Sequence, residues 1–180
     1  ERIETNDLIN EIRRDVTKWR MSGAFPHVTP ITRKLLTHWA DPDRDNRVLF
    51  CQREAAETAI FLAEVAGRHG YTDWRRRLSS TNEEFNRGLP RIALKMATGS
   101  GKTVVMAMLI AWQVLNKIHA PRDARFTSKF LIVAPGITIR DRLRVLQPSD
   151  PGNYYKLRDL VPADLKGGLD RAQVVITNYH

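Results

Sequence analysis

Residues 96–103, Met-Ala-Thr-Gly-Ser-Gly-Lys-Thr, place two glycines, a lysine and a threonine at the spacing of a phosphate-binding loop. Gly99 and Gly101 lack the Cβ that would keep the backbone away from phosphate oxygens. Main-chain N–H groups of such a loop point at an anion, at the positive end of the following helix. We expect Lys102 to reach the β- and γ-phosphates of a nucleotide and the Thr103 hydroxyl to hold Mg²⁺.

The segments around this loop predict the elements that position it. Residues 91–96 have the pattern of a short strand, and residues 102–118 that of a mostly apolar helix. Buried-strand patterns recur at 129–134 and 173–177, with a short basic helix expected at 138–146. Apolar strands that alternate with helices predict an α/β fold with a parallel sheet covered on both faces.

Helical patterns also precede the loop. Residues 6–21 are amphipathic, and a second helix is expected to begin at Pro30 with Thr29 as its N-cap. Residues 52–66 predict a third helix, rich in alanine. Residues 71–90 are polar and are expected to form an irregular surface insertion.

Three other segments have no predicted site of their own. Residues 41–46 form a polar, proline-containing linker, and residues 147–168 are expected to be rich in loops. Phe50 and Cys51 precede the third helix, and both are predicted to pack in the core.

The composition limits the class of protein. The chain has 180 residues with 42% hydrophobic content, which is enough for a core. Lys and Arg total 29 against 20 acidic residues, a net charge of +9 that favours a polyanionic partner, although such charges can also simply solvate a surface. One cysteine excludes an intrachain disulfide and fits the reducing cytoplasm, and the five histidines have no metal-ligand spacing. The longest apolar run is far shorter than the roughly 20 residues of a transmembrane helix.

The loop departs from the general pattern at one position, because Met96 stands where most phosphate-binding loops have a glycine. The variant Met-Ala-Thr-Gly-x-Gly-Lys-Thr resembles motif I of superfamily 2 helicases of the DEAD/DEAH type. It is similar above all to the motor subunits of restriction enzymes, such as the Res subunit of type III systems. The resemblance covers about residues 49–179 and implies a RecA-like P-loop NTPase fold that uses ATP and Mg²⁺.

The resemblance also assigns roles to residues of the nucleotide site. Residues 50–55 resemble the segment in which a glutamine amide pairs with adenine, which gives that role to Gln52; the alternative is an exposed glutamine at a helix N-terminus. Lys102 and Thr103 are the catalytic candidates, and Thr103 is also the Mg²⁺ ligand. The predicted nucleotide-binding residues are Gln52, Thr98, Gly99, Ser100, Gly101, Lys102 and Thr103.

Two later segments resemble nucleic-acid contacts of the same family. Residues 131–138 resemble motif Ia, where the loop after a strand touches the backbone of the tracked strand, and Thr138 is expected to cap the next helix. Residues 174–179 resemble the strand that precedes motif II. An ordinary strand–loop–helix joint with solvated arginines is the alternative for residues 131–138. A buried strand that ends in a polar turn is the alternative for residues 174–179. The predicted nucleic-acid contacts are Pro135, Gly136, Thr138, Arg140, Arg142 and Thr177.

The acidic motif II, which orients the attacking water, is expected beyond His180, so the chain is predicted to be a fragment of a longer protein. The fragment by itself is expected to hydrolyse little ATP. Residues 1–48 are expected to form a helical extension, and residues 49–180 the first part of the RecA-like motor domain.

The function expected for the parent protein is a nucleic-acid-dependent ATPase, a helicase or DNA translocase of a restriction-type enzyme in the cytoplasm. Its expected partners are double-stranded DNA, contacted at the backbone, and modification or specificity subunits, with no membrane. A superfamily 2 motor acting in DNA repair or on RNA, and a nucleotide-binding module without hydrolysis, are the alternatives.

Overall fold

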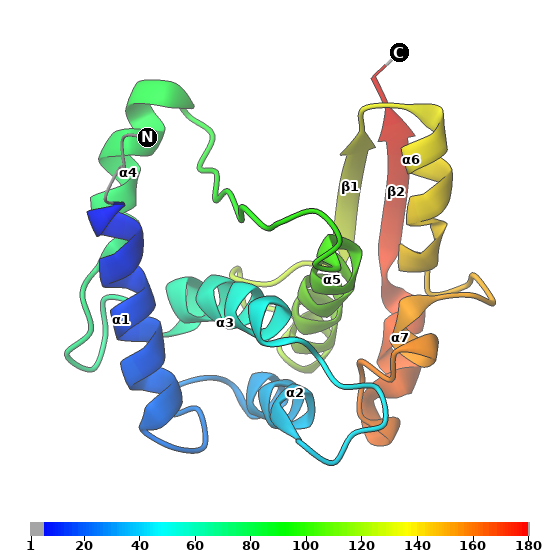
Figure 1. The fold of residues 1–180 in the computed structure, drawn as a ribbon, viewed down its shortest axis with the longest axis horizontal. Coiled ribbons are helices and arrows are strands. Elements are labelled where there is room, and N and C mark those ends of the chain that lie inside the picture. Colours follow the sequence, from blue (N-terminus) through cyan, green and yellow to red (C-terminus); the bar gives the residue numbers. More distant parts are fainter. Residues whose placement is uncertain (1–5, 180) are drawn as a thin grey trace. The chain divides into compact units, whose positions relative to one another are not determined.

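A computed structural model describes residues 6–179, and its contacts divide the chain into two compact units. One unit comprises Glu1–Val28 and Glu54–Lys95, and the other comprises Thr29–Arg53 and Met96–His180. Figure 1 shows the helices and strands of both units. The proposed division into residues 1–48 and 49–180 stays a prediction.

The first unit is helical. It contains α1 (Asp7–Met21) and most of α3 (Phe50–Glu64), so the helices predicted at 6–21 and 52–66 are confirmed to within two residues at each end. Trp19 and Phe61 are fully buried, with ring centroids 5.7 Å apart. Burial of these large side chains is the main stabilising term of the unit.

The prediction of an irregular segment at 71–90 was wrong, because a further helix, α4 (Trp74–Phe85), lies there. The Asp73 carboxylate accepts a hydrogen bond from a backbone N–H in its first turn. The Trp74 indole is buried and donates to the Asp15 carboxylate of α1 at 2.8 Å. This contact with α1 stabilises a segment that has no continuous apolar stripe of its own.

The second unit contains a parallel pair of strands. β1 (Lys129–Ala134) and β2 (Gln173–Asn178) lie in register from Lys129 opposite Gln173 to Ala134 opposite Asn178. Both strands were predicted, and the parallel pairing is confirmed. The prediction of a strand at residues 91–96 was wrong, because that segment forms no strand. Up to Lys95 it belongs to the first unit, whereas β1 and β2 belong to the second.

The sheet also differs from the prediction in its coverage. Leu131, Val133 and Val175 are 69%, 53% and 59% exposed, so one face of the strand pair is open. The other face carries buried residues such as Val174 and Ala134. The prediction that helices cover both faces of the sheet was therefore wrong for residues 6–179.

The long helix α5 (Lys102–His119) forms the centre of the second unit. It contacts α2 (Pro30–Ala40) and the 3-10 segment η2 (Ala163–Arg171). The predicted N-cap of α2 is confirmed, since the Thr29 hydroxyl accepts from a backbone N–H in the first turn. No helix among residues 6–179 is both long and apolar enough to cross a membrane.

The chain after β1 is more helical than predicted. The basic helix α6 (Ile137–Arg142) continues as a 3-10 turn, η1 (Leu143–Leu146), and α7 (Tyr154–Leu157) lies within the segment expected to be loop-rich. Tyr155 of α7 is buried and donates its hydroxyl to the Leu146 carbonyl at 2.9 Å, and burial raises the pKa of this phenol.

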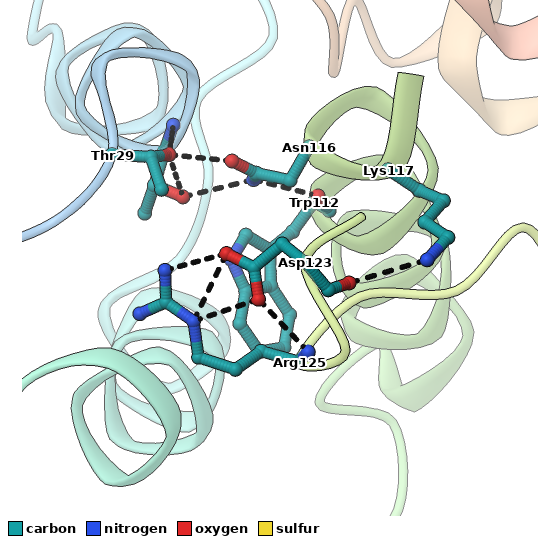
Figure 2. A network of polar contacts seen from close by, with 7 residues as sticks. Thr29, Trp112, Asn116, Lys117, Asp123 and Arg125 are labelled. Carbon is teal, nitrogen blue, oxygen red and sulfur yellow. Dashed lines mark hydrogen bonds and ion pairs between the residues drawn. The ribbon is translucent and has the colours of Figure 1, made fainter. Parts of the chain in front are cut away.

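A buried polar network joins α2 to α5 (Figure 2). The Asn116 amide nitrogen donates to the Thr32 hydroxyl at 2.9 Å and to the Trp112 carbonyl at 2.8 Å, and the Thr29 hydroxyl donates to the Asn116 oxygen. Asn116 is 2% exposed, so water does not compete for these bonds. The network therefore fixes the register of α2 against the helix that begins at the phosphate loop.

Asn116→Leu is expected to lower the free energy of unfolding by roughly 1–3 kcal/mol, because the hydroxyl of the buried Thr32 loses a partner. Urea unfolding followed by circular dichroism measures the change. Asn10→Leu, at an exposed position of α1, is the matched control and is expected to change stability little. Equal unfolding midpoints for the two variants would contradict a stabilising role of the network.

The connection from α5 to β1 is clamped by an ion pair, also drawn in Figure 2. Arg125 donates from Nε and Nη2 to the Asp123 carboxylate, at 2.7 Å for Nη2, and these hydrogen bonds lower the pKa of Asp123 to about 2. The lowered pKa means that the clamp is complete above the ordinary carboxyl range and is lost only as the pH falls toward 2.

Candidate nucleotide and nucleic-acid sites

The phosphate loop leads directly into α5. Gly99 and Gly101 have φ angles of +78° and +79°, in the left-handed region that favours glycine. Gly101 is the N-cap of α5 and brings no side chain to the N–H groups of the first turn. A long helix whose first turn is not capped by a side chain offers those donors to an anion.

The loop is closed around the carbonyl of Ala97. This oxygen accepts from the Ser100 hydroxyl at 2.7 Å and from the Lys102 ammonium at 2.8 Å. The exposed lysine therefore lies against the loop backbone, and its remaining two N–H donors stay able to bind an anion. Thr98 is exposed, and Thr103 is half-buried at the cavity described below.

Gln52 is bonded to this loop. It is 6% exposed, its amide nitrogen donates to the Ser100 carbonyl at 3.0 Å, and its amide oxygen accepts from the Leu49 N–H at 3.0 Å. The interpretation of Gln52 as an exposed residue was wrong. Its contact with adenine stays a prediction, since both ends of the amide are engaged within the chain.

The two residues before Gln52 were predicted to pack in the core, and this was wrong. Phe50 is 57% exposed and Cys51 is exposed. They lie in the first turn of α3, where the chain leaves the 41–46 linker, and only Gln52 of the three turns inward.

Gly101→Ala is expected to lower the unfolding temperature more than Gly99→Ala. Both substitutions place a Cβ at a positive φ, which costs roughly 1–2 kcal/mol. At Gly101 that Cβ would also lie 2.2 Å from the Gln52 amide nitrogen, whereas at Gly99 it would meet nothing within 4 Å. Thermal unfolding of the two variants separates these costs. Equal unfolding temperatures would show that the contact between Gln52 and the loop is not formed in solution.

A cavity of about 460 Å³ lies beside the loop, within the range typical of small-molecule sites. Gly99, Gly101 and Thr103 line it on the loop side. Its other walls are residues 45–49 and a segment containing Tyr154 and Arg158.

Sequence reasoning did not predict these walls, because it assigned the two segments to a linker and a loop. The one available signal was the spacing of Tyr154 and Arg158, which puts an aromatic and a cation one helical turn apart.

The Mg²⁺ prediction rests on Thr103. Thr103 lines the cavity beside the loop glycines, and a threonine hydroxyl fits as one ligand, with phosphate oxygens and water supplying the others. Among residues 6–179 no group of three or more His, Cys, Asp or Glu side chains could hold a metal by itself. The metal would therefore bind together with the nucleotide, and this stays a prediction.

Three of the predicted nucleic-acid residues lie at one edge of the sheet. Thr177 lies opposite Val133 in the parallel register, so Thr177 and the loop at Pro135 and Gly136 share the carboxyl end of the strand pair. The role of Thr138 as a helix cap was wrong, because Gly136 is the N-cap of α6 and Thr138 lies within the helix.

The arginines that follow on α6 and η1 differ in their ion-pair partners. Arg140 pairs with Asp141 at 3.1 Å and Arg144 with Asp150 at 3.4 Å. Arg142 is exposed and has no ion pair within the part of the chain that the structure describes.

The other basic residues between 121 and 147 do not join this group. They precede β1 or lie at its amino end, whereas α6 follows its carboxyl end. The residues before β1 or at its amino end are Arg122, Arg125 and Lys129.

The chain resembles one known protein family. A family model described as "Type III restriction enzyme, res subunit" matches residues 34–179 and spans both the phosphate loop and the strand pair. The match defines a superfamily 2 helicase-like ATPase motor domain. The chain belongs to the family of type III restriction enzyme res subunits. Comparisons with curated proteins and with solved structures gave no match.

Proposed function

We propose that this chain is the ATP-binding part of a DNA translocase or helicase with a RecA-like fold, the motor of a restriction-type enzyme. The observation that carries the proposal is the loop before α5, with two left-handed glycines, a lysine bonded to the loop backbone and an adjoining cavity. Membership in the res subunit family supports the same assignment.

In this proposal the loop stabilises charge on the nucleotide. Lys102 moves from the Ala97 carbonyl to the β- and γ-phosphates, and backbone N–H groups at Thr98 and Ser100 add further donors. Thr103 would hold Mg²⁺, which would supply positive charge to neutralise the phosphate oxygens. Gln52 ties the base side of the site to the loop.

DNA is proposed to bind at the carboxyl edge of β1 and β2. Pro135, Gly136 and Thr177 lie there, and Arg140 and Arg142 follow on α6. Contacts of arginine with phosphates are independent of sequence, which suits a motor that moves along DNA. Modification or specificity subunits are the proposed protein partners and the cytoplasm the proposed location.

Isothermal titration of the 180-residue chain with ATP and Mg²⁺ tests the proposal. We expect saturable binding of ATP and much weaker binding of adenosine, because most of the affinity comes from charge-assisted contacts with phosphates. A chain that binds adenosine as well as ATP, or binds neither, would contradict a phosphate-loop ATPase site.

A further inference from the structure

The cavity beside the phosphate loop extends to two segments that lie far apart in the sequence. One is the linker at residues 45–49, and the other is the start of α7 with the turn that follows it. Tyr154 presents an aromatic ring there, and the Arg158 guanidinium lies 5.5 Å from the centre of that ring. The site thus has an aromatic surface and a cation at a distance from the phosphate loop.

Arg44 joins the two segments. Its guanidinium donates to the Asn46 carbonyl of the linker, and to the carbonyls of Arg158 at 3.1 Å and Asp159 at 2.6 Å. A fourth bond goes to the His38 carbonyl at the end of α2. The residue is 8% exposed, and a cation that is nearly out of water is tolerated only when such bonds replace its hydration.

The turn after α7 is held from α2 as well. The Trp39 indole donates to the Leu160 carbonyl at 2.8 Å, and His38 Nε2 lies 2.8 Å from the Asp159 carbonyl. Asp159 has a φ of +45°, an unfavourable value for a residue with a Cβ that surrounding contacts must maintain. The cavity wall is therefore preorganised by contacts that do not depend on a ligand.

The phosphates and the base need different partners. The loop and Lys102 supply donors for phosphates, but the Gln52 amide is engaged by Ser100 and Leu49. An aromatic ring stacks on a purine, and Arg158, with no ion pair in the described range, has donors for ribose or base oxygens and nitrogens.

We propose that the nucleoside end of the nucleotide binds between residues 45–49 and the α7 segment. Tyr154 and Arg158 contact the base and sugar, and Arg44 is the positioning residue that sets the distance between the two walls. This inference rests on the proposed ATP-binding function and assigns its specificity to residues outside the phosphate loop.

The test compares two probes, ATP and inorganic tripolyphosphate, each titrated with Mg²⁺ into the 180-residue chain. We expect Tyr154→Leu, Arg158→Met and Arg44→Lys each to weaken ATP binding by roughly fivefold or more and to leave tripolyphosphate binding unchanged. Lys102→Ala is expected to weaken both. Arg171→Met, which removes an exposed arginine far from the cavity wall in sequence, is the matched control for Arg158.

Unchanged ATP affinity in the Tyr154 and Arg158 variants would overturn the inference, and so would an equal loss for both probes. Should Arg44→Lys fail to fold, the other two variants decide, since neither side chain is buried. A wild-type chain that binds neither probe would instead refute the proposed function, so the two failures are distinguishable.

Discussion

Lys102→Ala is expected to raise the dissociation constant for ATP with Mg²⁺ by roughly ten- to a hundredfold, because one charge-assisted contact with the phosphates disappears. The Lys102 ammonium already lies over the loop, 2.8 Å from the Ala97 carbonyl, so little rearrangement is needed to reach a bound phosphate. The loss of a preorganised cation should therefore appear almost entirely in binding. Calorimetric titration of the two proteins measures it.

Lys129→Ala is the matched control for this experiment. It removes the same charge from an exposed position at the start of β1, the end of the strand opposite to its carboxyl edge. We expect the control to bind ATP like the wild type. Equal affinities for the wild type and the Lys102 variant would mean that this lysine does not contact the nucleotide.

Arg142→Ala is expected to lower the magnitude of the slope of log K against log salt for double-stranded DNA by about 0.9, the value of one lost phosphate contact. Arg142 is exposed and has no ion pair in residues 6–179, whereas Arg140 must first give up its bond to Asp141. The effect of Arg140→Ala should therefore be smaller. DNA affinity measured by fluorescence anisotropy over a range of salt concentrations gives both slopes.

Arg171→Ala serves as the control for DNA binding. Arg171 is an exposed arginine just before β2, at the amino end of the strand pair, and it should not contact DNA bound at the carboxyl edge. If the Arg142 and Arg171 variants have the same slope, Arg142 does not contact a DNA phosphate.

Local chemistry made several elements predictable. The cap at Thr29 with Pro30 after it, the apolar helix that follows the phosphate loop and the buried-strand patterns of β1 and β2 depend on residues close together in the chain. Each was found in the structure within two residues of its expected bounds. The resemblance to motif I also led to the family that the comparison then showed.

Elements that depend on distant partners were not predictable in this way. α4 is held by Trp74, which is buried and donates a hydrogen bond to Asp15 of α1. No residue close to Trp74 in the sequence indicates that Asp15 would be its partner. The expected strand at 91–96 failed for the converse reason, since a strand pattern forms a strand only where a neighbouring backbone pairs with it.

The sequence by itself determined the phosphate loop, because the spacing of Gly99, Gly101 and Lys102 is local and only glycine favours those φ angles. Only the tertiary structure decided what surrounds the loop. Gln52 turned inward to bond the loop while Phe50 turned out, and Arg44 joined a linker to a turn more than a hundred residues away. Such contacts follow from the packing of the whole unit, in which a buried polar group must find a partner wherever the chain brings one.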